Sequence, residues 1–223
     1  MKVKSDGLLG ALEGRFSEVS ITARDFSVNG LPLFSEPERS KYGRIKSLKL
    51  RLFDFSLRGL RIEELKADLR DCRFDFALAL DERKVRLSRS GSGEGYVRVN
   101  EKALEDFILR KYHEIKRIRV ELKKYKVYVE GYGEFPFFKT EFYVIADLVP
   151  KNDFEIHLEN AFVFLGRSID ETMKRALLDF INPVIHENED LALYGALKMK
   201  RVEIGEGVLE LFGEARIPER PNL

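Results

Sequence analysis

Few residues in this chain have the type and the spacing that catalysis requires. The three histidines, His113, His157 and His186, lie far apart, and none stands at the spacing of a zinc site or a catalytic triad. The single cysteine, Cys72, can add no second thiolate ligand and can form no intrachain disulfide. Residues 90–95, SGSGEG, lack the lysine and the helix of a phosphate-binding loop. We therefore predict a protein that is not an enzyme and that uses no cofactor or metal.

The composition is unusual for a nucleic-acid-binding protein and is compatible with one folded domain. The 39 lysines and arginines nearly balance the 38 aspartates and glutamates, for a formal net charge of +1, whereas a nucleic-acid binder usually carries a clear basic excess. Hydrophobic residues make up 44% of the chain, and no stretch resembles a linker, so we predict one domain over residues 1–223. No apolar run has the length of a signal peptide or of a membrane span. We expect a cytoplasmic or peripheral membrane protein, or an extracytoplasmic one if an export signal has been removed.

One pattern recurs in three stretches, which are VSITARDFSV (19–28), LKLRLFDFSL (48–57) and LKADLRDCRF (65–74). Apolar residues occupy every second position, which predicts strands with one buried and one exposed face. An aspartate breaks the alternation at the same point of each copy, at Asp25, Asp54 and Asp71. Such a break indicates a bend or a bulge. Because these strands cannot bury their apolar faces individually, we expect them to lie side by side and to cover a helix or a ligand.

Two other segments have the period of helices. Asn100 predicts the N-terminus of the first, since asparagine caps helices well, and its apolar face includes Leu104, Phe107 and Ile108. The second begins with the capping box of residues 168–171 and could extend to residue 186, a length of about 27 Å. Its apolar stripe consists of Ile169, Met173, Ala176, Leu177, Phe180, Ile181 and Val184. Pro183 is expected to kink or end this helix.

The remaining periodic segments predict strands. Residues 75–87 extend the run of repeated strands, and a slip of phase at Lys123–Lys124 indicates a bulge within one long strand over residues 118–133. Two more strands and a closing hairpin are predicted at residues 137–149, 154–165 and 197–217. The expected fold class is α+β, with a long, strongly curved antiparallel β-sheet wrapped around one or two long helices.

With its elements in this order, the chain resembles the bacterial LmeA-like phospholipid-binding family, from about Leu8 to Ile217. The resemblance rests on the repeated strands entered at Ile45 and Ile62, on the strand-to-helix segment Val97–Leu104, on Asn182-Pro183, and on the closing hairpin with Gly213. One departure is visible at residues 193–197, LYGAL, which lack the proline of the Leu-Pro-x-Gly-Leu segment of such proteins. The resemblance implies a tubular lipid-binding fold with an apolar groove for acyl chains and without catalytic chemistry.

The expected function is therefore the binding, or transfer, of a phospholipid or fatty acid in a groove between sheet and helix. The candidate lipid-binding residues are Leu104, Phe107, Ile108, Met173, Leu177, Phe180, Ile181 and Val184. The periodicity does not distinguish an open slot from a filled core. The alternative is a structural or interaction protein of the same fold, with a filled core and a protein partner.

A second group of residues is a candidate for contact with a membrane surface or a lipid headgroup. Residues 135–138, FPFF, follow a glycine-containing turn, and the segment 110–126 is rich in lysine and arginine, which anionic membranes attract. The candidates are Phe137, Phe138, Lys116, Arg117, Arg119, Lys123 and Lys124. The alternatives are inward-facing phenylalanines that begin a strand and the solvated face of a strand.

Overall fold

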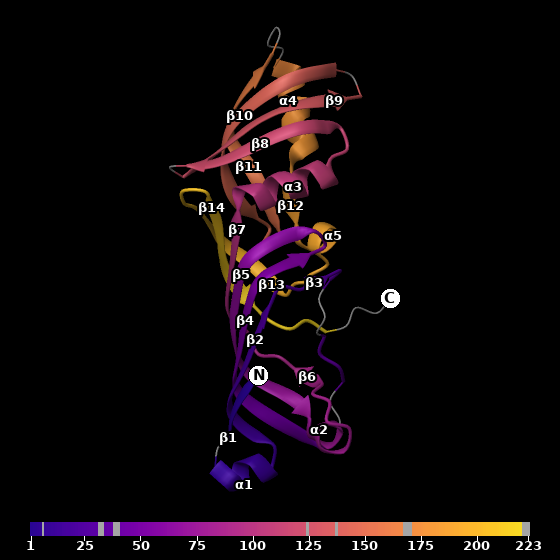
Figure 1. The fold of residues 1–223 in the computed structure, drawn as a ribbon, viewed down its shortest axis with the longest axis vertical. Coiled ribbons are helices and arrows are strands. Elements are labelled where there is room, and N and C mark those ends of the chain that lie inside the picture. The colour runs from indigo at the N-terminus through magenta and orange to yellow at the C-terminus, as the bar shows by residue number, and fades with distance from the viewer. Residues whose placement is uncertain are drawn as a thin grey trace.

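The computed structural model describes residues 1–5, 7–30, 34–37, 41–123, 125–136, 138–166 and 171–219. The molecule is elongated, with a nine-stranded sheet along its lower and middle parts and a five-stranded sheet at its upper end (Figure 1). Strands hold 60% of the residues and helices 19%, and one sheet curls strongly into a half-barrel. The α+β class with dominant strands is therefore confirmed.

The nine-stranded sheet has the order β1-β2-β4-β5-β7-β14-β13, with β3 on β4 and β6 on β5. Its strands are β1 (Lys2–Ser5), β2 (Arg15–Arg24), β3 (Ser27–Val28), β4 (Tyr42–Leu57), β5 (Leu60–Asp75), β6 (Leu87–Arg89), β7 (Gly93–Asn100), β13 (Leu197–Ile204) and β14 (Val208–Ala215). The short helices α1 (Gly7–Leu12) and α2 (Phe76–Asp81) lie at its lower end (Figure 1).

The three repeated stretches are neighbours in this sheet, as β2 with β3, β4 and β5. The first two pair in parallel, with Val19 opposite Leu48, so the sequence alignment of these two copies is also their structural register. The third pairs antiparallel to the second, with Leu48 opposite Leu69, so an entirely antiparallel sheet is a wrong prediction. The common aspartates have positive φ angles of 56°, 50° and 52°, at Asp25, Asp54 and Asp71. Aspartate tolerates this left-handed conformation better than most residues, which explains the predicted bends.

The five-stranded sheet has the order β12-β11-β10-β9-β8. Its strands are β8 (Ile115–Lys123), β9 (Lys126–Phe135), β10 (Phe138–Lys151), β11 (Glu155–Leu165) and β12 (Ile185–His186). Three helices accompany it, α3 (Glu101–Lys111), α4 (Glu171–Ile181) and α5 (Glu187–Leu191). At the edge strand β8, the N–H groups of Val120 and Leu122 donate to the carboxylates of Glu105 (3.0 Å) and Glu101 (2.7 Å) of α3.

The helices are shorter than the sequence predicted. α3 and α4 each have 11 residues, so no long helix wrapped by the sheet is found among the described residues. After α4 ends at Ile181, the chain continues past Pro183, and the N–H of Val184 donates to the carbonyl of Ile156 at 2.9 Å. Pairing with β11 therefore replaces the last predicted helical turns. Residues 168–170 of the predicted capping box lie outside the described residues, and its Glu171 is the first residue of α4.

Two other predictions were wrong. Residues 76–81 form helix α2 instead of a strand, because Asp75 caps it through a hydrogen bond from the N–H of Leu78 (2.9 Å). The phase slip at Lys123–Lys124 marks a turn between β8 and β9 and not a bulge, since Lys123 is opposite Lys126. A short apolar run and a slip of phase are each compatible with two structures.

The buried apolar side chains form two clusters. One cluster of buried apolar side chains joins the five-stranded sheet and α3 to the upper part of the larger sheet, and a second fills the lower part. The predicted strand position of Cys72 is confirmed, and its thiol is fully buried in the second cluster. Of the helices in the described ranges, none is long and apolar enough to cross a membrane.

Candidate functional site

A cavity of about 170 Å³ lies between the inner face of the larger sheet and the segment that follows α4. Its sheet side is formed by apolar residues of β4, β5, β7, β13 and β14, and Phe26 and Val28 border it near β3. Its opposite wall comes from β12, α5 and residues 193–197. Lys66, Tyr96, Glu187 and Arg216 also border the hollow. The site is thus an apolar hollow with few polar groups, which is the usual composition of a small-molecule site.

The hollow exists because small residues meet on the inner face of the sheet. Ala67 of β5 is opposite Leu50 on one side and Gly95 of β7 on the other. Ala215 of β14 lies close by, since a Cβ added to Gly95 would stand 3.0 Å from the Ala215 Cβ. The small side chains of Ala67 and Ala215 leave space on this face, whereas the side chain of Leu197 covers Gly95. The pair Leu52 and Leu65 borders the hollow and is only half-buried, so solvent reaches part of its rim.

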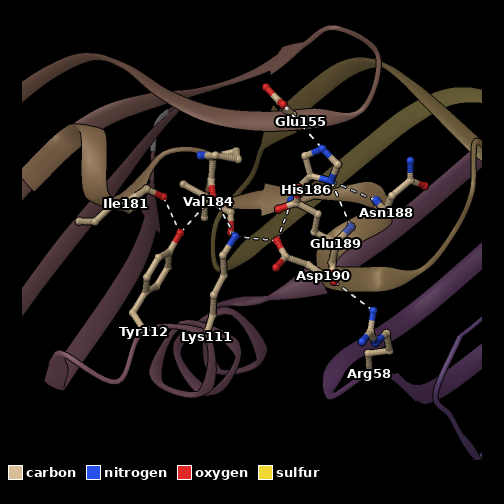
Figure 2. Close-up of polar contacts among 11 residues, drawn as sticks. Arg58, Lys111, Tyr112, Glu155, Ile181, Val184, His186, Asn188, Glu189 and Asp190 are labelled. Carbon is tan, nitrogen blue, oxygen red and sulfur yellow. Dashed lines mark hydrogen bonds and ion pairs between the residues drawn. The ribbon is translucent and has the colours of Figure 1, made fainter.

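The wall opposite the sheet is held in place by Lys111, the last residue of α3 (Figure 2). Its ammonium group donates to the carbonyls of Pro183 (2.9 Å) and Val184 (3.1 Å) and forms an ion pair with Asp190 at 2.6 Å. The side chains of Lys111 and Asp190 are only 20% and 13% exposed. One cation therefore fixes both ends of the segment that carries α5.

Two further contacts hold the same segment (Figure 2). The hydroxyl of Tyr112 lies 2.6 Å from the carbonyl oxygen of Ile181 and 3.0 Å from that of Pro183. Burial raises the pKa of Tyr112, which keeps this hydroxyl a donor. Arg58, between β4 and β5, donates to the carbonyl of Glu189 at 3.0 Å.

His186 begins α5 and serves a structural purpose there. Its Nδ1 accepts the N–H groups of Asn188 (3.2 Å) and Glu189 (3.1 Å), while Nε2 faces Glu155 at 3.7 Å (Figure 2). Acceptance at Nδ1 requires that this nitrogen carry no proton. His157 lies 2.7 Å from the same carboxylate. Within the described ranges, no group of three or more His, Cys, Asp or Glu residues is arranged to hold a metal ion.

Glu187 is the unusual polar residue of the cavity. Its side chain is 1% exposed. Its Oε1 accepts the N–H of Leu197 at 3.3 Å, and its Oε2 has no hydrogen-bond partner among the described residues. Burial raises the pKa of Glu187, although the backbone N–H groups of residues 195–197 and the charge of Arg216 oppose this. Arg216 is exposed, and its Nε donates to the carbonyl of Gly195 at 2.9 Å.

The eight apolar candidates from the sequence come together in the cluster that joins the five-stranded sheet and α3 to the larger sheet. Six of them are buried there, and Met173 and Phe180 are partly buried against it. Four border a small cavity of about 30 Å³, namely Leu104, Ile108, Ile181 and Val184. None of the eight lines the larger cavity.

The candidates for surface contact lie on and beside β8 to β10. Arg117 pairs with Glu141 at 3.0 Å, and Glu121 pairs with Arg119 and Lys123 at 2.8 and 2.6 Å. Lys116 donates to the carbonyl of His113 at 2.7 Å. Phe138 is partly buried and packs on Phe135, with ring centroids 4.9 Å apart. Phe137 and the side chain of Lys124 lie outside the described residues.

Sequence reasoning missed the residues that form the larger cavity. One signal was available, because Ala67 is the small residue at the position that Ile21 and Leu50 occupy in the other copies of the repeat. The opposite wall gave no comparable signal, since α5 has five residues and no apolar period. Comparison with known proteins adds nothing further: no family model, curated protein or solved structure matches this chain.

Proposed function

We propose that this protein binds an alkyl or acyl chain, such as that of a phospholipid or fatty acid, in the cavity between the larger sheet and α5. The observation that carries the proposal is an apolar hollow of about 170 Å³, compared with about 30 Å³ for the cavity beside α3. An engineered apolar cavity of about 150 Å³ in another protein stays dry and binds benzene. The resemblance to the LmeA-like family favours the same class of ligand.

The size of the cavity limits what enters it. A space that suits one aromatic ring holds a short alkyl segment, so the rest of a long chain would follow the half-buried rim at Leu52 and Leu65. Each methylene removed from water contributes about 0.8 kcal/mol, so a few buried methylenes are sufficient for binding in the micromolar to millimolar range.

The first experiment is native mass spectrometry of the purified protein, followed by denaturation and analysis of the extracted lipid. Adducts of lipid mass that disappear on denaturation are the expected result. If no adduct is found and no added fluorescent lipid is taken up, the alternative of an interaction protein with a protein partner replaces this proposal.

A pair of variants locates the bound chain. Ala67→Phe places a ring in the hollow and should reduce uptake of a fluorescent fatty acid at least tenfold, because the ring occupies the space of the ligand. Thr22→Phe is the matched control, since Thr22 is exposed on strand β2 of the same sheet and does not line the cavity. Equal uptake by both variants, each with a normal unfolding transition, would show that the chain binds elsewhere.

A further inference from the structure

The carboxyl group of Glu187 is only partly satisfied in the apolar surroundings of the cavity. Unpaired buried acceptors are rare because each loses its hydrogen bonds to water without replacement. Oε1 is satisfied by Leu197, whereas Oε2 lacks a partner in the part of the chain that the structure describes. The side chain is 1% exposed and belongs to the cavity lining. A group of this kind is what a ligand's polar end would complete.

We propose that Glu187 is a polar anchor that selects ligands whose alkyl chain ends in a hydrogen-bond donor, such as a hydroxyl or an ammonium group. This inference rests on the proposed function, because it concerns the ligand of the same cavity. Oε2 has almost no accessible surface in the empty cavity, so the Glu187 side chain turns toward the hollow to accept the hydroxyl or ammonium proton. The alkyl chain packs beside the small residues Ala67 and Ala215.

The charges around the cavity support a donor over an anion. If the ligand ended in a carboxylate, this group and the Glu187 carboxylate would face each other as two acceptors, because neither has a proton to donate when ionised. Arg216 could hold a carboxylate, but it is exposed, and its Nε is engaged by the carbonyl of Gly195 at 2.9 Å. Fatty acids are therefore predicted to bind more weakly than alcohols or amines of equal length.

The test compares four probes of similar chain length on the wild-type protein at pH 8 by calorimetric titration. Octan-1-ol and octylammonium carry donor heads, octan-2-one carries only an acceptor, and octanoate carries a negative charge. We expect the two donors to bind at least about tenfold more tightly than octan-2-one, and octanoate to bind most weakly. The relative affinity of the alcohol and the ammonium ion tells which donor the site prefers.

Two variants assign the selectivity to Glu187. Glu187→Leu should remove the preference for donors, so that octan-1-ol, octylammonium and octan-2-one bind this variant with affinities within about threefold of one another. Glu187→Gln should weaken octylammonium more than octan-1-ol, because the charge is lost while an acceptor remains. Thermal unfolding of both variants checks that they fold.

The outcomes separate the two proposals. If none of the four probes binds the wild-type protein, the proposed function fails, and the selectivity proposal fails with it. If the probes bind without a preference for donors, or if the preference survives in Glu187→Leu, the proposed function stands and the role of Glu187 is rejected. The panel on the wild-type protein decides the question even if a variant does not fold.

Discussion

The buried carboxyl of Glu187 affects stability as well as the cavity. A carboxyl that is buried with one oxygen unpaired binds its proton more tightly in the folded protein than in the unfolded chain. Its pKa in the folded state is accordingly raised from the ordinary value of 4.5, with burial as the main cause. The free energy of unfolding that this group contributes is therefore greatest in acid and declines as the pH rises.

This gives a prediction for Glu187→Gln. Above pH 4.5 the unfolded chain releases this proton before the folded protein does, so the wild-type protein loses stability until the raised pKa is passed. The glutamine variant has no proton to release, so its free energy of unfolding should rise relative to that of the wild-type protein over this pH range. Urea unfolding of both proteins from pH 4 to pH 8 measures the difference. A difference that stays constant with pH would contradict a raised pKa.

At the scale of elements, side chains form hydrogen bonds with backbone groups of the five-stranded sheet that have no partner strand. Asn182 accepts the N–H of Leu158 at 2.8 Å and donates to its carbonyl at 3.1 Å, so that its amide takes the place of a neighbouring strand on β11. The segment 182–187 then continues the pairing through Val184, Ile185 and Glu187. Asn182 therefore sets where α4 ends and where the cavity wall begins.

We predict that Asn182→Leu destabilises the protein by about 2 kcal/mol, because the two backbone groups of Leu158 would be left unpaired in a buried position. Asn188→Leu is the control, since Asn188 is exposed on α5, and its effect should stay within about 0.5 kcal/mol. Chemical denaturation of the two variants measures both changes. Similar losses in the two variants would show that the Asn182 amide does not act as described.

The elements differ in how far the sequence could predict them. The sequence predicts features that depend on local periodicity or local hydrogen bonding. These are the repeated strands, their bends at Asp25, Asp54 and Asp71, and the N-cap of α3 at Asn100. The parallel pairing of β2 with β4 could not be predicted, since the repeated pattern is compatible with parallel and with antiparallel pairing. The cavity could not be predicted either, because it depends on residues of β5, β7, β14 and α5 that only the fold brings together.

At the scale of the whole molecule, Lys111 connects the two sheets. It belongs to α3, which packs on β8 and β5, and it holds the segment that pairs with β11 and forms the cavity wall. The ion pair with Asp190 is mostly shielded from water, so loss of the lysine would leave this carboxylate without its counter-charge and the Val184 carbonyl without the lysine donor. The Pro183 carbonyl would keep the Tyr112 hydroxyl.

We predict that Lys111→Met lowers the free energy of unfolding by about 3 kcal/mol, as expected when one partner of a buried ion pair is removed. It should also weaken ligand binding, because the cavity wall is no longer fixed. Arg58→Met removes an exposed contact to the same segment and should change stability by less than about 0.5 kcal/mol.

The double variant Lys111→Met with Asp190→Leu provides the decisive comparison. It should recover most of the lost stability, since an apolar pair leaves no isolated charge. A double variant as unstable as Lys111→Met would show that the contacts with Pro183 and Val184, and not the ion pair, account for the loss.

The carboxylates of α3 on β8 have a consequence for the behaviour of the protein in concentrated solution. An open strand edge is a template on which a second chain can pair and start a fibril. On β8 the N–H groups of Val120 and Leu122 are already taken by Glu105 and Glu101, and the strand carries exposed basic side chains. The protein thus protects this edge from aggregation with its own first helical turns, and loss of those two glutamates would expose it.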